Sequence, residues 1–227
     1  MRKISVVFTI LFLITGFSFA HSLWITLDRY RINPGEKAIY YIGYGHKYLS
    51  IEERVVNLQE NYQKMFKKVE VYRPDGKKVI LIPEKGAGKI NADVEGTYVI
   101  CMESVRKAGE PYGPSGKYAK TILQVGKKTT DPSRNCGFRV EIIPLKNPEE
   151  IRPGEYLPVK IIFEGKPLST FVYATYSGYK PVEDAFPVMT RSNSDGIAKI
   201  KISNPGEWMI LVSHRVNYSA TLTFEVK

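Results

Sequence analysis

The sequence predicts an all-β protein built from two Ig-like β-sandwich domains, and three observations predict it. Short segments rich in Val, Ile, Tyr, Phe and Thr recur along the chain. Turn sequences separate them, such as Asn-Pro-Gly at 33–35 and Asp-Gly at 195–196. The segment 197–202 alternates apolar and polar residues with period two, as in a sheet with one face in water. Many short strands at this spacing are typical of β-sandwiches.

Residues 1–20 read as a secretory signal peptide and are set apart from the fold. Arg2 and Lys3 precede an apolar run over 4–14, and Ser18 and Ala20 supply the small residues of a cleavage site. An uncleaved membrane anchor is the alternative, but the run is shorter than the ~20 residues that a membrane span needs. We therefore expect an exported or periplasmic protein whose mature chain begins at His21.

The first domain is expected over residues 21–125. Its predicted strands are 22–27, 37–44, 67–73, 78–82, 97–103 and 118–125. Between the second and third of these, apolar residues recur at helical spacing at positions 51, 55, 58, 62 and 65. Ser50 and Glu53 fit a capping box in front of them. A short helix inserted in this domain is therefore predicted.

The polar segment 126–135 has no strand pattern and is the predicted linker to a second, Ig-like domain over 136–227. The strands predicted there are 138–143, 157–163, 170–175, 197–202, 208–214 and 220–226. Both domains would be close to the size of about 100 residues that is usual for an immunoglobulin-like sandwich.

Charge and motifs exclude several function classes. The chain carries 33 Lys+Arg against 23 Asp+Glu, but the basic residues are spread along it and export disfavours a nucleic-acid partner. The common nucleotide-binding and hydrolase motifs are absent, and no motif places a serine near a histidine and an aspartate. We therefore expect a non-enzymatic protein.

Cys101 and Cys136 are the two cysteines of the sequence. An oxidising compartment permits a disulfide between them, and we expect one. Two buried free thiols are the alternative, because the sequence does not show whether the Cα atoms approach within bonding range.

The three histidines form the candidate metal site: His21, His46 and His214. After cleavage, the α-amine and the imidazole of His21 can chelate one ion together, and a third imidazole would complete a histidine brace. His46 follows a strand among glycines, and His214 ends a strand on the side of Trp208. Taken alone, each histidine is better explained by an ordinary structural or surface role, and it is the three together that point to a metal. If all three bind one ion, the metal lies between the two domains.

The order of several short motifs resembles a family of exported proteins described as periplasmic components of cobalt/nickel uptake systems. The motifs include His-Ser-Leu-Trp at 21–24, Gly-His at 45–46, Val-Tyr-Arg-Pro-Asp-Gly-Lys at 71–77 and the segment 205–214. The resemblance implies two β-sandwich domains that bind a divalent transition metal and serve the membrane subunits of a metal transporter. Nickel or cobalt is the expected cofactor, although nitrogen ligands also suit copper and zinc.

Two rival functions remain open at this stage. Fifteen Tyr, ten Phe and two Trp make 12% of the residues aromatic, and exposed aromatic rings on a β-sandwich can bind a sugar or a protein. A copper-bound histidine brace would support an oxidase. The sequence favours a nickel- or cobalt-binding protein over both.

Overall fold

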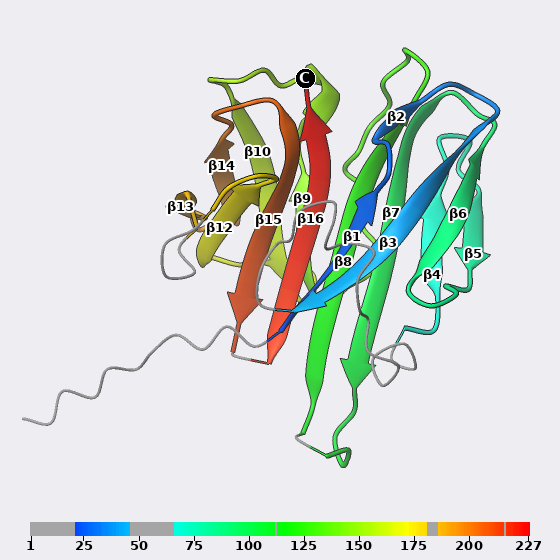
Figure 1. Ribbon diagram of the computed structural model, residues 1–227. Helices are drawn as coiled ribbons and strands as arrows, with labels where there is room; N and C mark the ends of the chain where they lie inside the picture. The colour runs from blue at the N-terminus through cyan, green and yellow to red at the C-terminus, as the bar shows by residue number, and fades with distance from the viewer. Residues whose placement is uncertain (1–20, 46–65, 112, 181–185, 216) are drawn as a thin grey trace, which may run out of the picture.

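The computed structural model describes residues 21–45, 66–111, 113–180, 186–215 and 217–227 (Figure 1). Within these ranges the regular structure is β-strand, apart from the 3-10 turn η1 (Pro148–Glu150). The expected signal peptide at 1–20 and the expected helix at 50–65 lie outside the described residues. No helix of the described part is long and apolar enough to cross a membrane.

A nine-stranded sheet runs through the centre of the molecule. Its strands, in spatial order, are β13 (Val188–Arg191), β12 (Phe171–Tyr176), β15 (Gly206–His214), β16 (Tyr218–Val226), β8 (Ser115–Val125), β7 (Gly96–Arg106), β4 (Val69–Tyr72) and β5 (Lys78–Leu81). The ninth, β2 (Arg31–Ile32), pairs with the end of β8. At the middle, β16 and β8 pair in parallel, whereas the neighbouring pairs are antiparallel.

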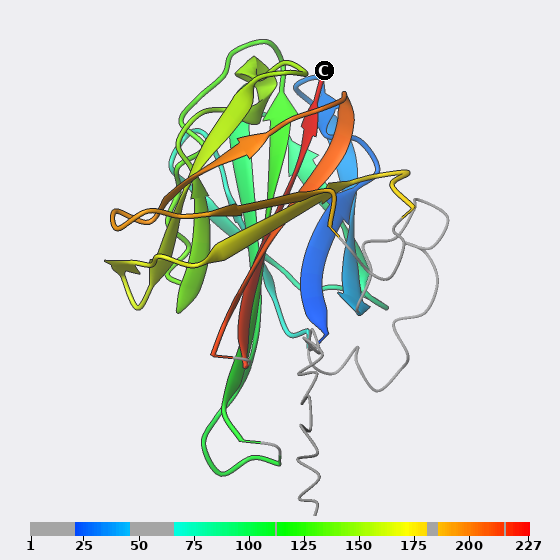
Figure 2. The same ribbon diagram turned by 90° about the vertical axis from the view of Figure 1, so that its left-hand side faces the viewer.

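Two smaller sheets cover opposite faces of this central sheet. One contains β1 (Ser22–Leu27), β3 (Glu36–Gly45) and β6 (Ala87–Ala92). The other contains β9 (Val140–Pro144), β10 (Tyr156–Phe163), β11 (Lys166–Pro167) and β14 (Ile197–Lys201). Figure 2 shows the blue strands of the first and the yellow-green strands of the second on the two sides of the central strands. The fold is therefore two β-sandwiches with one sheet in common.

Strand alternation sends neighbouring side chains of the central sheet into two different cores. Along β7, Tyr98 and Ile100 belong to the core beneath β1, whereas Val99 belongs to the core that contains Trp208. β8 is buried along its whole length because a sheet covers each of its faces. Each core fills the space between two sheets, as in a β-sandwich.

The expectation of two separate domains is not confirmed, because the two sandwiches share the central sheet. β8 closes the predicted first domain and β16 closes the second, yet Ala220 lies opposite Tyr118 in a continuous ladder. The segment 126–135 has no strand, as predicted, but it packs on the sheet: the Lys120 Nζ donates to the Arg134 carbonyl at 2.8 Å. The pairing of β8 with β16 joins segments about a hundred residues apart and leaves no local pattern in the sequence.

The disulfide prediction is confirmed. Cys101 of β7 is bonded to Cys136, with Cα atoms 6.3 Å apart. The bond fastens the segment that precedes β9 to the central sheet. Every predicted strand is present, and the structure adds the short or glycine-containing strands β2, β6, β11 and β13.

Candidate metal site at the N-terminal strand

The start of β1 positions His21 beside the end of β3. The two strands are antiparallel, and Ser22, which follows His21, lies opposite Gly45. Gly45 directly precedes His46, which lies outside the described residues. The backbone positions next to two of the three candidate ligands are therefore cross-strand neighbours.

Two threonines of the central sheet hold β1 in place. β1 is an edge strand of its sheet, and the Thr221 hydroxyl donates to the Leu23 carbonyl at 2.6 Å. The Thr223 hydroxyl donates in the same way to the Ile25 carbonyl. Side chains thus satisfy carbonyls that have no neighbouring strand, and a fixed β1 gives His21 a fixed starting point.

Aromatic packing orients the His21 side chain. Its ring is stacked on Tyr44 of β3, with centroids 5.1 Å apart and planes 6° apart. Tyr44 in turn meets Phe66 edge-on at 6.0 Å. The imidazole is thus partly ordered by contacts that the protein itself supplies, and such pre-orientation lowers the cost of binding a ligand.

A glycine in β3 makes room for the neighbouring tryptophan. Gly43 lies opposite Trp24, and a Cβ built on Gly43 would come within 2.0 Å of the Trp24 ring. Trp24 is 3% exposed, so the ring has no free space into which it can move. Gly43 therefore has a packing role, whereas a Cβ built on Gly45 would make only an ordinary contact with Trp24 at 3.6 Å.

His214 lies on the other side of the central sheet. It ends β15 opposite Tyr218 of β16, and its ring lies 4.4 Å from that of Phe163 in the second outer sheet. Burial lowers the pKa of His214, and the nearby Arg215 lowers it further, against the opposing effect of Glu164. A lowered pKa favours the neutral, metal-competent imidazole, but the surroundings of the ring are those of a packed side chain.

The structure therefore does not bring His214 and His21 together. Leu222 and Tyr218 of β16 contribute to the core that His214 borders, whereas Thr221 between them points to β1. The expected three-histidine site between two domains is corrected on this point, because the central sheet separates the two residues. Among the described residues, no group of three or more His, Cys, Asp or Glu side chains could hold a metal ion.

Sequence reasoning missed a buried polar row beneath β1. The row takes one residue from each of four neighbouring strands, and these residues lie directly opposite one another: Ser104 of β7, Lys117 of β8, Ser219 of β16 and Ser213 of β15. Lys117 is 7% exposed, and burial together with Arg106 lowers the pKa of Lys117 to about 8. Lysines look like surface residues in a sequence, and the segment around Lys117, Ser-Gly-Lys-Tyr-Ala-Lys-Thr at 115–121, gives no signal of its burial.

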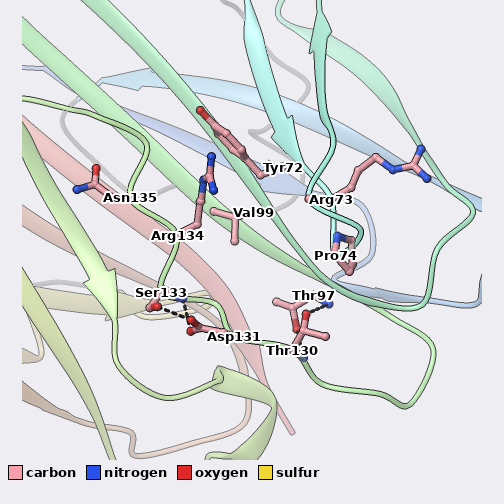
Figure 3. A pocket seen from close by; sticks show the side chains of 11 residues that line it. Tyr72, Arg73, Pro74, Thr97, Val99, Thr130, Asp131, Ser133, Arg134 and Asn135 are labelled. Carbon is pink, nitrogen blue, oxygen red and sulfur yellow. Dashed lines mark hydrogen bonds between the residues drawn. The ribbon is translucent and has the colours of Figure 1, made fainter.

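A pocket of 440 Å³ lies elsewhere, between the segment before β9 and strands β4 and β7 (Figure 3). The Arg134 guanidinium lies over the Tyr72 ring at 4.3 Å, and the Ser133 hydroxyl donates to Asp131 at 2.7 Å. In Figure 3 the Arg73 side chain points away from these residues, and it pairs with Asp93. None of the candidate metal ligands lines this pocket.

Comparison with known proteins gives a family and distant structural likenesses. The family described as "Domain of unknown function (DUF4198)" matches residues 18–216. No curated protein matches significantly.

Three solved structures illustrate the structural likenesses. The D0-D1 domain of intimin is 15% identical over 89% of this chain and 96% of its own, with a TM-score of 0.27. Murine CEACAM1b is 10% identical over 91% and 98%, with a TM-score of 0.24. The Clostridium thermocellum CbhA fibronectin(III)-like modules are 12% identical over 89% and 94%, with a TM-score of 0.26. At TM-scores this low, no argument about function rests on them.

Proposed function

The chain belongs to the DUF4198 family, a domain of unknown function, and from its own residues we propose an exported, non-enzymatic protein that binds a divalent transition-metal ion for uptake. The metal is nickel or cobalt. Its ligands are the amine and imidazole of His21 and the imidazole of His46.

One observation carries the proposal: the pairing of Ser22 with Gly45. It joins the residue after His21 to the residue before His46, although 23 positions separate the paired residues in the chain. Two imidazoles and an amine are a nitrogen donor set that suits nickel, cobalt, copper and zinc. Geometry and supply then decide the choice among these metals.

The proposal depends on export and on cleavage after Ala20. Only then does His21 carry a free amine, whose unperturbed pKa of about 8 leaves a useful fraction deprotonated near neutral pH. In the periplasm the loaded protein would pass its ion to the membrane subunits of a transporter. His214 has no part in this site, because it lies against Phe163 on the opposite face of the central sheet.

The test is a calorimetric titration of nickel and of cobalt into the mature chain that begins at His21. His21→Ala and His46→Ala should each lower the affinity at least about tenfold, because the loss of about 1.4 kcal/mol of binding free energy with one ligand is a tenfold change. His214→Ala is the matched control and should bind as the parent does. Binding that survives both His21→Ala and His46→Ala would refute the proposal.

A binding module for a sugar or a protein is the second candidate, and an aromatic patch on β12 and β13 favours it. Phe171 is 48% exposed and Met189 is 64% exposed, and both share one face with Tyr173. The Arg191 guanidinium lies 5.3 Å from the centroid of the Phe171 ring. Retention on polysaccharide columns that Phe171→Ala abolishes, with metal affinity unchanged, would support this candidate over the first.

A further inference from the structure

The buried polar row beneath β1 contains a lysine and a hydroxyl that have no partner in the described part of the chain. Lys117 is 7% exposed as a residue, and its ammonium is not one of the fully buried atoms without a partner, so the ammonium reaches solvent. The Ser219 hydroxyl, directly opposite it, is buried and has no partner there either. Buried polar groups are nearly always satisfied, so an unsatisfied Ser219 hydroxyl beside a solvent-accessible ammonium points to a missing ligand.

The missing ligand carries negative charge. The effects on the pKa of Lys117 come from burial and from Arg106, a second cation, and include no carboxylate. Arg106 and Ser115 lie opposite each other at the next level of the same face, where the Arg106 Nε donates to the Ser115 hydroxyl at 2.8 Å. An ammonium on a largely buried side chain is costly unless an anion accompanies it.

The row lies at the level of the candidate metal site. Thr221 is hydrogen-bonded to Leu23 and Thr223 to Ile25, so β1 and β16 run in the same direction with a fixed register. Two residues earlier on both strands, the same register places His21 at the level of Ser219, which pairs with Lys117. In Figure 1, β7 and β8 extend past the start of β1, so the row lies near this end of the sandwich.

We infer that Lys117 and Ser219 form an anion pocket that binds the carboxylate of a small organic acid. The Lys117 ammonium and the Ser219 hydroxyl each donate to one carboxylate oxygen. The Lys117 ammonium and one neutral hydroxyl match the two oxygens of a carboxylate group, whereas inorganic phosphate presents more oxygens than these two donors can satisfy. As a co-ligand, the acid would also complete the coordination of the ion at His21; this second role rests on the proposed metal-binding function.

The experiment titrates citrate into the metal-free mature chain near pH 7 by calorimetry. One citrate should bind per chain, and Lys117→Met should weaken binding at least about tenfold, the loss of one hydrogen bond to a charged group. Lys89→Met removes an exposed lysine of β6 and is the matched control, expected to bind as the parent does. Ser219→Ala, which removes one hydroxyl, should weaken citrate binding and leave the fold intact.

Unchanged citrate affinity in Lys117→Met, or no saturable binding to the parent, would overturn the pocket. Inorganic phosphate is the comparison arm, and phosphate binding tighter than citrate would overturn the carboxylate assignment. A repeat with nickel separates the two proposals: citrate binding without nickel binding leaves the pocket intact and removes the metal function. If nickel binds equally well with and without citrate, only the co-ligand role of the acid is removed.

Discussion

At the scale of single residues, β8 sends two lysines into two different cores. Lys117 faces the core beneath β1, whereas Lys120 faces the other core and is paired with Glu141. Glu141 also accepts from the backbone N–H groups of Cys136 and Phe138, at 2.7 and 3.2 Å. The Lys120–Glu141 pair therefore fixes the segment before β9 on the sheet, whereas Lys117 has no such partner in the described chain.

Lys120→Met should destabilise the protein by about 3 kcal/mol, because it leaves the Glu141 carboxylate buried without its cation. Urea unfolding monitored by tryptophan fluorescence measures the change. Lys89→Met, at an exposed position, should alter the free energy of unfolding by less than about 0.5 kcal/mol. Equal stability of the two variants would mean that the buried pair contributes nothing.

Lys117 predicts a distinct pH dependence of stability. The pKa of Lys117 is about 8 in the folded state and near the ordinary lysine value of 10.5 in the unfolded chain. Between these values the unfolded chain binds more protons, so the free energy of unfolding due to Lys117 rises with pH. The difference in stability between the parent and Lys117→Met, followed from pH 7 to pH 11, should show this rise. A difference that stays constant with pH would contradict a buried, charged Lys117.

The sequence reveals little of this residue-scale chemistry. It identified the disulfide of Cys101 and Cys136 correctly, because two cysteines in a chain that is expected to be exported have few alternatives. It did not identify Lys117, Lys120 or Glu141, because charged residues in a strand are normally read as its solvent face. Their burial depends on which sheets cover β8, and that is set by distant parts of the chain.

At the scale of elements, the strands were predictable and their partners were not. Composition and turn residues located β1 and β10 closely, because both features are local. The strands missed were β2 and β11, of two residues each, the four-residue β13, and β6, which contains a glycine. The hydrogen bonds from Thr221 to Leu23 and from Thr223 to Ile25 join elements 198 residues apart, which no local pattern encodes.

These hydrogen bonds yield a prediction about β1. Thr221→Val and Thr223→Val keep the shape of the side chain but leave the Leu23 and Ile25 carbonyls without a donor. Each change should cost about 1 kcal/mol, and hydrogen exchange of the β1 amides should become faster than that of β10. Thr190→Val on β13, remote from β1 in the sheet order, is the control. Unchanged exchange in β1 would show that the threonines do not hold the strand.

At the scale of the whole molecule, the central sheet makes the two sandwiches interdependent. In the isolated segment 21–125, β8 would lose its partner β16, and Val99 and Ile122 would lose the second core. We predict that this segment alone does not fold cooperatively, whereas the full mature chain does. Thermal unfolding by circular dichroism, on both chains under the same conditions, provides the comparison. A sharp transition for the segment would restore the view of two independent domains.

The central claim is that the freed amine of His21 is a metal ligand, and the nickel affinity of two chains tests it most directly. One begins at His21, and the other carries a single glycine in front of it, which converts the amine into an amide and leaves the imidazole in place. The account predicts that the added glycine lowers the affinity at least about tenfold, the loss of one ligand. Equal affinity for nickel in the two chains would contradict it.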